Sequence, residues 1–545
     1  SDEAYERARR WITICDDSHE DCARMLESTL PTRVIDVRPP DEPGGAIIWI
    51  SNGTKAPYVA LSYCWGPSNY QTTRDNLGSH IRRLPCQALP QTINDAIHST
   101  RQLGLRYLWV DSLCIIQDYE EDVAREIARM EDIYKNAYIT ISAASAKDCH
   151  SGFLGRRHSF AILPGEEPIC LPYRCADGVL GTVGLFRHST AGLVRDPIHE
   201  RAWTLQEHLL SPRLLVYGTV QQFWSCASKF EQDGDLIALG NQATHEQWDL
   251  MKRVLSPSCT VQAQRDACSA RESSYLWQQY VDPLALAWKD IVEEYSSRKL
   301  TDPLDKLPAL SAAASAFART SRDEYVLGHW TTHLLPQLLW TSKDPTATRS
   351  SVWRCPSWSW LSMDGPVGIW PQYLERPAET PVAEVLSYSV APVWDYAPYG
   401  RIASCSLVVK GWLKPVVLDA RAKRAMPEME GREHDQSVDI RLDCEDEYLE
   451  QHPSPAEGGP PDRKWCLTLV RWVPHFQWML GKRDVAHAMG GLILDMTPEG
   501  ARRIGAFSCN RIRHGRFSSY KEDPAVFIWT SYWLVSGETT TVTLI

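Results

Sequence analysis

The feature that most constrains the fold is a series of apolar segments, rich in strand-forming residues, that alternates with segments of helical periodicity. Residues 58–65 are rich in β-formers and stop at Gly66-Pro67, which predicts a buried strand. Because a strand–helix–strand order implies right-handed crossovers, the pattern predicts an α/β domain with a parallel sheet flanked by helices, over about 56–228. The elements predicted after the first strand are a helix over 89–104, a strand over 106–116, a helix over 120–137, a strand over 138–145, a helix over 203–210 and a strand over 214–217.

The segments outside this domain have other patterns. Residues 1–55 predict an amphipathic helix over 5–26 and then a Pro-rich extended lead-in. Residues 229–345 predict a mainly helical region, and residues 346–545 a β-rich C-terminal region in which short strand-like runs alternate with turns. The strands predicted in this last region cover 405–409, 466–472, 491–494, 527–530 and 540–545.

Charge and hydropathy exclude two classes of partner. The net charge of −11 argues against nucleic acid as the main partner, because proteins that bind phosphate backbones usually carry a basic face. The apolar stretches are far shorter than the roughly 20 residues of a membrane span, and no apolar N-terminal leader is visible, so we expect a cytoplasmic protein with no membrane partner. In that compartment the 16 cysteines are expected to be reduced thiols. A local basic cluster is interpreted as a solvated face; it consists of Arg502, Arg503, Arg511, Arg513, His514 and Arg516.

Three residues near the N-terminus have the spacing of metal ligands. Cys15, His19 and Cys22 stand at i, i+4 and i+7 and would share one face of a helix, as three ligands of a structural zinc would. No fourth ligand is evident nearby in the sequence. The sequence therefore favours the alternative, a helix that packs small apolar thiols inward, and predicts no prosthetic group.

Five motifs then occur in order within about 170 residues. They are Tyr58-Val-Ala-Leu-Ser-Tyr-Cys-Trp-Gly66, Leu89-Pro-Gln-Thr-Ile-Asn-Asp-Ala-Ile97, Tyr107-Leu-Trp-Val-Asp-Ser-Leu-Cys-Ile-Ile-Gln-Asp118, Met130-Glu-Asp-Ile-Tyr-Lys-Asn-Ala137 and Arg201-Ala-Trp-Thr-Leu-Gln-Glu207. This series resembles the HET domain of fungal heterokaryon incompatibility proteins. The resemblance implies a fungal source, a role in non-self recognition and regulated cell death, and other incompatibility proteins as partners.

A second resemblance concerns the chemistry. The HET core is similar to a TIR domain in its first strand and loop, residues 58–66, and Trp203-Thr-Leu-Gln-Glu207 is similar to the Trp-Cys-x-x-Glu segment of enzymatic TIR domains. The resemblance implies that Glu207 is the carboxylate that supports hydrolysis of NAD at the nicotinamide–ribose bond. The chain departs from the TIR pattern at Thr204, where TIR domains usually have Cys, and at Trp65, where they often have Arg.

That reaction would pass through an oxocarbenium-like ribosyl cation, which a carboxylate beside the ribose can stabilise. The residues expected to form the nucleotide pocket around Glu207 are Ser62, Tyr63, Trp65, Gly66, Asp111, Arg201 and Trp203. Asp111 closes a strand-like run, and ligands of parallel sheets bind at the carboxyl ends of strands. The structural alternative is that Glu207 pairs with Arg201 or Arg213 and fixes its helix.

Two other functions stay open at this point. The core can be a non-enzymatic signalling module that acts by self-association. It can also be an enzyme that acts on a small metabolite through Cys114 or Cys64, paired with a histidine such as His199 or His208. For both cysteines the sequence favours buried, inert thiols. Trp109, inside a predicted strand, is expected to be buried.

Overall fold

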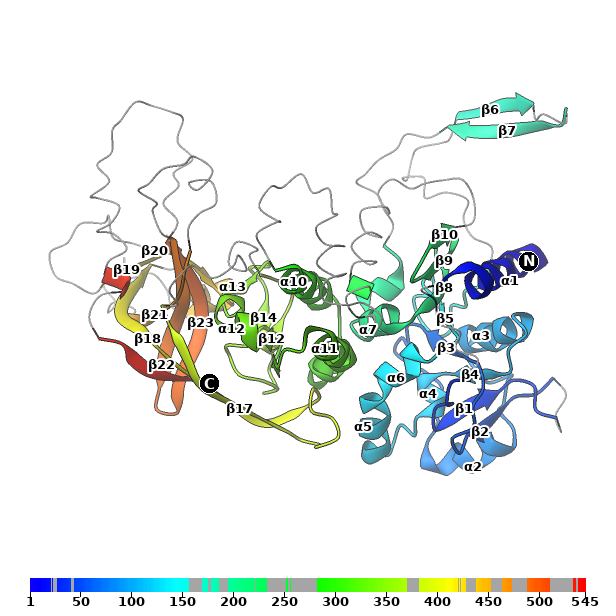
Figure 1. Cartoon of the computed structure of the whole chain (residues 1–545), viewed down its shortest axis with the longest axis horizontal. Coiled ribbons are helices and arrows are strands. Elements are labelled where there is room, and N and C mark those ends of the chain that lie inside the picture. The colour runs from blue at the N-terminus through cyan, green and yellow to red at the C-terminus, as the bar shows by residue number, and fades with distance from the viewer. Residues whose placement is uncertain are drawn as a thin grey trace. The chain divides into compact units, whose positions relative to one another are not determined.

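The structure is a computed structural model, and it divides the chain into two compact units, residues 1–252 and 253–545 (Figure 1). The residues that it describes are 1–20, 22, 27–40, 44–155, 169–174, 178–185, 195–219, 221–232, 251–252, 255, 282–369, 382–419, 421, 423–427, 438–451, 463–472, 488–509, 533–535 and 538–545. Each unit is described by itself below.

The first unit is built on an eight-stranded sheet with the strand order β10-β9-β8-β5-β3-β4-β1-β2. The four central strands, β4, β3, β5 and β8, are parallel, and antiparallel strands extend the sheet at both ends. The strands are β1 Arg33–Asp36, β2 Ile47–Ile50, β3 Tyr58–Ser62, β4 Tyr107–Trp109, β5 Ile139–Ser142, β8 Arg213–Tyr217, β9 Gln222–Cys226 and β10 Phe230–Gln232. The predicted parallel sheet is thus confirmed for the centre, while the antiparallel edges were not predicted.

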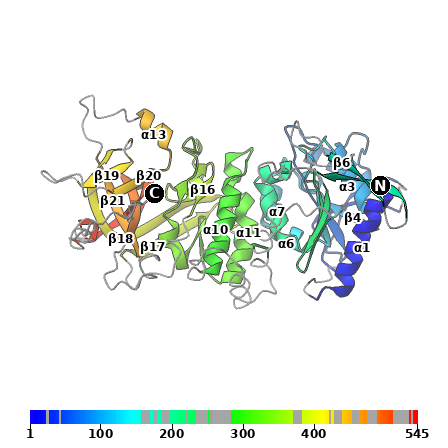
Figure 2. The same cartoon turned by 90° about the horizontal axis from the view of Figure 1, so that it is seen from above.

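Helices cover both faces of this sheet. Figure 2 shows α1 and α3 on one face and α6 and α7 on the other. Every residue of β3, β5 and β8 is buried, as is usual for parallel strands between two helical layers. The helices are α1 Asp2–Ser18, α2 Arg74–Arg82, α3 Gln91–Gln102, α4 Asp111–Cys114, α5 Glu120–Ala128, α6 Met130–Lys135 and α7 Trp203–Leu210. A separate hairpin pairs β6 Ile169–Arg174 with β7 Leu180–Leu185.

The order of the four parallel strands creates a switch point. Taken in sequence, they lie as second, first, third and fourth, which is a doubly wound order. After β3 the chain forms β4, which lies on one side of β3, and then β5, which lies on the other side of β3. Ligands of such sheets bind outside the carboxyl ends of the strands between which the order reverses, here β3 and β5. Ser62 and Ser142, which are register partners, close these two strands.

Three predicted elements of this unit differ from the structure. The strand predicted over 106–116 ends at Trp109, because the chain turns into α4, where the Asp111 carboxylate accepts a hydrogen bond from the Ser112 amide (2.7 Å). The helix predicted over 120–137 is divided at Arg129, whose backbone (φ −98°, ψ 1°) leaves the helical region. The helix predicted over 5–26 ends at Ser18, because His19 is extended. The helix predicted over 203–210 is confirmed as α7.

The second unit combines two long helices with a mostly antiparallel sheet, which confirms the β-rich C-terminal region. The 18-residue strand β18 is its central element and pairs with β17, β19, β21 and β24. The principal elements are α10 Pro283–Ser296, α11 Pro308–Ser321, β17 Glu384–Pro392, β18 Ile402–Asp419, β19 Arg424–Pro427, β20 Val438–Leu442, α13 Glu445–Gln451, β21 Arg463–Trp472, β22 Ala488–Thr497, β23 Gly500–Cys509 and β24 Thr540–Leu544. Between α11 and β17 lie α12 Leu334–Gln337 and six two-residue strands, β11 Tyr325–Val326, β12 His329–Trp330, β13 Thr341–Ser342, β14 Thr348–Arg349, β15 Met363–Asp364 and β16 Val367–Gly368. The strand predicted over 527–530 lies outside the described residues.

Arg503 is a buried cation in the core of the second unit, so its assignment to a solvated basic face was wrong. Its side chain is fully buried, forms two hydrogen bonds to Asp443 (2.9 and 3.0 Å), and lies 3.6 Å from the centroid of the Trp340 ring. Arg349 also pairs with Asp443, at 2.7 Å. Arg502, the preceding residue, is exposed, as the alternation of β23 requires. The other members of the predicted cluster, Arg511, Arg513, His514 and Arg516, lie outside the described residues.

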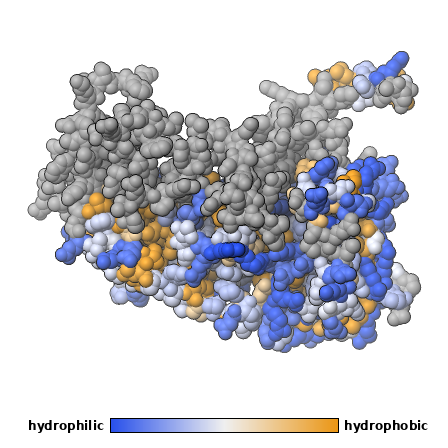
Figure 3. All heavy atoms as spheres, in the orientation of Figure 1, coloured by the Kyte–Doolittle hydropathy of each residue, from blue (hydrophilic) through white to orange (hydrophobic). Residues whose placement is uncertain are grey.

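On the visible face of the first unit the described residues are mainly hydrophilic, and apolar residues form small separate spots (Figure 3). Among the helices that the structure describes, none has both the length and the apolar composition needed to cross a membrane.

The second unit should depend on Asp443. Asp443→Ala leaves the buried Arg503 guanidinium and the partly buried Arg349 guanidinium without their carboxylate, and the loss of the partner of a buried charge costs about 3–5 kcal/mol of unfolding free energy. Asp439→Ala, the same change at an exposed position of β20, should cost less than about 0.5 kcal/mol. Chemical denaturation of the two variants beside wild type measures the difference; equal midpoints for both variants would contradict this role.

Candidate functional site

The predicted catalytic residue, Glu207, lies against the carboxyl end of β3. It stands in the middle of α7, which packs on the sheet beside α6. Ser62, the last residue of β3, donates a hydrogen bond from its hydroxyl to Glu207 Oε2. Only 3 % of Glu207 is exposed. The structure therefore brings Ser62 and Glu207 together at the switch point of the sheet. Of the two arginines expected as alternative partners of Glu207, Arg213 pairs with Asp16, whereas the positive charge of Arg201 acts on Glu207.

The surroundings of Glu207 favour its neutral form. Burial, and secondarily the negative charge of Asp111, raise the pKa of Glu207 to about 7. The Arg201 guanidinium, the hydrogen bond from Ser62 and the nearby Tyr134 hydroxyl oppose this shift, because they stabilise the carboxylate. A carboxyl group with a pKa near 7 can donate or accept a proton under ordinary conditions, and such groups are concentrated at functional sites.

A second group of predicted residues lies beside this pair. The indole Nε1 of Trp65 donates to Asp111 Oδ2 at 2.8 Å, and the Arg201 guanidinium lies 5.2 Å from the centroid of the Trp65 ring. Arg201 also donates to the Tyr63 carbonyl at 3.1 Å. Burial raises the pKa of Asp111, while Arg201 and Trp65 lower it. Asp111, Trp65 and Arg201 thus form one network, which is electrostatically coupled to Glu207.

Three other predicted pocket residues have structural roles or peripheral positions. The Tyr63 side chain is buried; its hydroxyl donates to Ser112 Oγ (2.9 Å) and accepts from Asn69 (2.7 Å). Gly66 adopts φ +74°, and a Cβ at this position would lie 2.6 Å from Asp148 Cβ. The role of Gly66 is therefore to allow the turn that follows β3. Trp203 begins α7 four residues before Glu207, on the same side of the helix, and is half-buried.

The thiols proposed as alternative nucleophiles are both buried. Burial raises the pKa of Cys64 to about 11 and that of Cys114 to about 12. Because the thiolate is the nucleophile, these values disfavour Cys chemistry at neutral pH. The two predicted histidine partners, His199 and His208, lie near each other, with their ring centroids 6.1 Å apart. Trp109 is fully buried, as expected.

Sequence analysis missed two residues of the described sites. The hydroxyl of Tyr134 donates to the Leu61 carbonyl (3.1 Å) and also stabilises the Glu207 carboxylate. Tyr134 belongs to an apolar helical stripe, so nothing in the sequence distinguished it from the core. Cys226, at the end of β9, is the second: it joins Cys15, His19 and Cys22 in one cluster.

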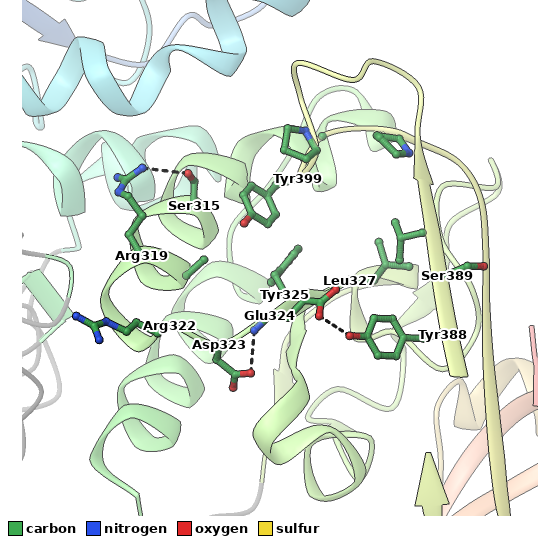
Figure 4. Close-up of a pocket in the computed structure, with 15 residues that line it drawn as sticks. Ser315, Arg319, Arg322, Asp323, Glu324, Tyr325, Leu327, Tyr388, Ser389 and Tyr399 are labelled. Carbon is green, nitrogen blue, oxygen red and sulfur yellow. Dashed lines mark hydrogen bonds between the residues drawn. The ribbon is translucent and has the colours of Figure 1, made fainter. Parts of the chain in front are cut away.

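A groove of about 710 Å³ lies in the second unit and contains none of the predicted residues. It is lined by the end of α11, the turn that follows and β17 (Figure 4). Its polar groups bind one another: Tyr388 donates to Glu324 (2.5 Å), which raises the pKa of Tyr388 to about 12, and Arg319 donates to Ser315 (3.4 Å). The groove is therefore lined by both apolar and polar side chains, and these polar side chains bind one another.

The geometry defines a class of protein, a doubly wound α/β domain with a buried carboxyl group at its switch point. Residues 58–207, which run from the first residue of β3 to Glu207 itself, match the model of the family described as Heterokaryon incompatibility protein (HET). This segment of the chain is therefore similar to the HET family, as its motifs predicted.

One curated relative supports the same assignment. The Heterokaryon incompatibility protein 6, OR allele, of Neurospora crassa is 30% identical to this chain over 89 residues. The match covers 15% of this chain and 13% of that protein, so it concerns a small part of each. No solved structure matches this chain significantly, and the likeness to TIR domains stays a prediction.

The stability of the first unit should depend on pH through Glu207. A glutamate in the unfolded chain has a pKa of about 4.3, whereas that of Glu207 is raised to about 7. Between these two pKa values the folded state therefore binds one proton that the unfolded state has lost. Protonated Glu207 thereby contributes up to about 3 kcal/mol to the unfolding free energy; this contribution is fully present below pH 4 and is lost as the pH rises through 7. Glu207→Gln keeps the shape without the charge.

We expect the melting temperature of Glu207→Gln, relative to wild type, to rise as the pH is increased from 5 to 8. Thermal unfolding followed by circular dichroism measures this difference. Glu120→Gln, at an exposed position of α5, is the matched control and should show no such trend. A difference that is constant with pH would mean that Glu207 titrates normally.

Proposed function

We propose that this chain acts in heterokaryon incompatibility, as an effector of non-self recognition and regulated cell death, and that its HET domain hydrolyses NAD at the nicotinamide–ribose bond. The first part is supported by the match of residues 58–207 to the family and by the name of the Neurospora relative. The second part rests on one observation: a buried carboxyl group, Glu207, bound by Ser62 at the point of the sheet where doubly wound proteins bind nucleotides.

In the proposed reaction the bond between ribose C1′ and the nicotinamide nitrogen breaks, and its electron pair neutralises the pyridinium. Water then adds to C1′ and loses a proton. Because the leaving group is already cationic, no strong general acid is needed. Glu207, in its ionised form, binds the ribose hydroxyls and stabilises the positive charge that develops on the ring.

The Trp65 network gives the nicotinamide a place to bind. The face of the Trp65 ring contacts a cation, the Arg201 guanidinium. The pyridinium of NAD can occupy the same face by the same cation–π interaction. Asp111 fixes the orientation of the indole through its Nε1 hydrogen bond. Arg201, once displaced, is suited to the pyrophosphate, because guanidinium groups bind phosphate oxygens in a bidentate manner.

The closed arrangement also implies that access is regulated. Glu207 is 3 % exposed, and the Ser62 hydroxyl already occupies one of its oxygens. A dinucleotide reaches Glu207 only after the segment that carries Trp65 moves. We therefore expect slow turnover in the resting protein and faster turnover when a partner or self-association opens this segment.

The direct test is release of nicotinamide from NAD by the purified full chain, over a wide range of protein concentration. Glu207→Gln should reduce the rate at least 100-fold, because it removes the charge that stabilises the transition state. Glu120→Gln, which removes an exposed glutamate of the same unit, should retain the wild-type rate. Release that persists in Glu207→Gln would refute the catalytic role of Glu207, and the absence of release by wild type at every concentration would refute hydrolysis.

The pH dependence gives a second, independent readout. Because the ionised carboxylate is the active form and the pKa of Glu207 is raised to about 7, kcat/KM should rise between pH 6 and 8 and level off above pH 8. A profile that is already flat from pH 5.5 would show that an ordinary carboxylate, or no carboxylate, carries the reaction.

A further inference from the structure

Four potential metal ligands converge on one point at the edge of the first unit. Cys15 lies in the last turn of α1, His19 follows the helix, and Cys22 comes three residues later. Cys226 closes β9, more than 200 residues away in the sequence. One ligand atom from each of these four residues lies within 4.8 Å of those of the other three.

The distances fit a tetrahedral zinc site. With Zn–S bonds of about 2.3 Å and Zn–N bonds of about 2.0–2.1 Å, a tetrahedron separates ligand sulfurs by about 3.8 Å and sulfur from nitrogen by about 3.6 Å. The Nδ1 atom of His19 lies 3.4 Å from Cys226 Sγ and 3.9 Å from Cys22 Sγ. A hydrogen bond from the Cys22 amide to the His19 carbonyl (3.3 Å) forms the turn that holds these two residues together.

Inward packing of thiols does not explain this arrangement. It accounts for the burial of Cys15, Cys22 and Cys226, but it gives no reason for an imidazole nitrogen to point at the sulfurs. The three thiols are free and not joined in a disulfide. The set of three cysteines and one histidine is a ligand combination that structural zinc sites use.

We propose that Cys15, His19, Cys22 and Cys226 bind one structural Zn²⁺ that joins the N-terminal helix to the sheet. Four protein ligands leave no open position for substrate, so the ion has no catalytic role. Three thiolates and one neutral imidazole around Zn²⁺ carry a net charge of −1. Arg213, a buried cation of β8 that pairs with Asp16 at 2.7 Å, lies next to the Cys15 end of α1 and compensates part of this charge.

The proposed site defines how much chain the HET domain needs. All four ligands lie outside residues 58–207, three before and one after. The ion would connect the two flanking segments, so that a fragment limited to 56–228 would lack three of the four ligands. Zinc binding is thus a property of the whole first unit and is independent of the proposed NAD hydrolysis.

The test is the metal content of the full chain, purified under reducing conditions without chelator and measured by mass spectrometry of the elements. We expect about one zinc per chain in wild type and in Cys86→Ser, which changes a thiol of the same unit outside the cluster. Cys226→Ser should lose at least 90% of the zinc. His19→Ala should lose it as well, whereas His19→Cys, which restores four ligands, should retain it.

A measurement on the wild-type chain covers the case in which the variants do not fold. Metal-free protein titrated with Co²⁺ should develop the intense visible absorption of a tetrahedral thiolate complex, which saturates at one equivalent and is abolished by Zn²⁺. Removal of the metal should also lower the melting temperature. Wild-type protein without zinc and without this cobalt spectrum would overturn the proposal, as would equal zinc contents in Cys226→Ser and Cys86→Ser.

Discussion

The hydrogen bond between Ser62 and Glu207 is the contact on which the proposed activity depends. It joins the last residue of the central strand to the helix that follows 145 residues later, and it keeps a carboxyl group in a site from which water is excluded. Burial raises the pKa of this group to about 7, so the domain holds Glu207 in a state that is unfavourable for folding at alkaline pH. A purely structural position would be better filled by an apolar residue or an amide. The presence of an ionisable group at this buried position is the physical reason to assign it a function.

The rest of the first unit holds this contact in place. The parallel strands β3 and β5 position Ser62 at the reversal of strand order, and α6 and α7 cover the face on which Glu207 lies. Trp65 contacts both Asp111 and Arg201, and the charges of these two residues act on the pKa of Glu207. The N-terminal helix is attached to the opposite face through Asp16, which pairs with Arg213, and through the cysteine–histidine cluster. Segments before and after the HET match are therefore part of the same fold.

Local pattern predicted the central strands, α3 and α7, because these segments carry their own periodicity and their own stop signals. The residues expected around Glu207 came from the resemblance to TIR domains. Contacts between distant segments were not visible in the sequence. Cys226 lies more than 200 residues from the other ligands of its cluster, and Tyr134 is indistinguishable from the core residues of its helical stripe. Arg503 looked like part of a solvated basic cluster, because only the fold shows that Asp443 and Trp340 surround it. The antiparallel strands β1 and β9 were missed for a related reason: β1 has four residues and β9 has five, and each is stabilised by pairing with a strand that the fold supplies.

The most direct test of this account is a crystal structure of the protein with a non-hydrolysable NAD analogue. The account predicts that the nicotinamide ring lies on Trp65 in place of the Arg201 guanidinium, and that a Glu207 oxygen lies within hydrogen-bond distance of the adjoining ribose hydroxyls. An analogue bound elsewhere, with the Ser62–Glu207 hydrogen bond and the Arg201–Trp65 contact unchanged, would contradict it.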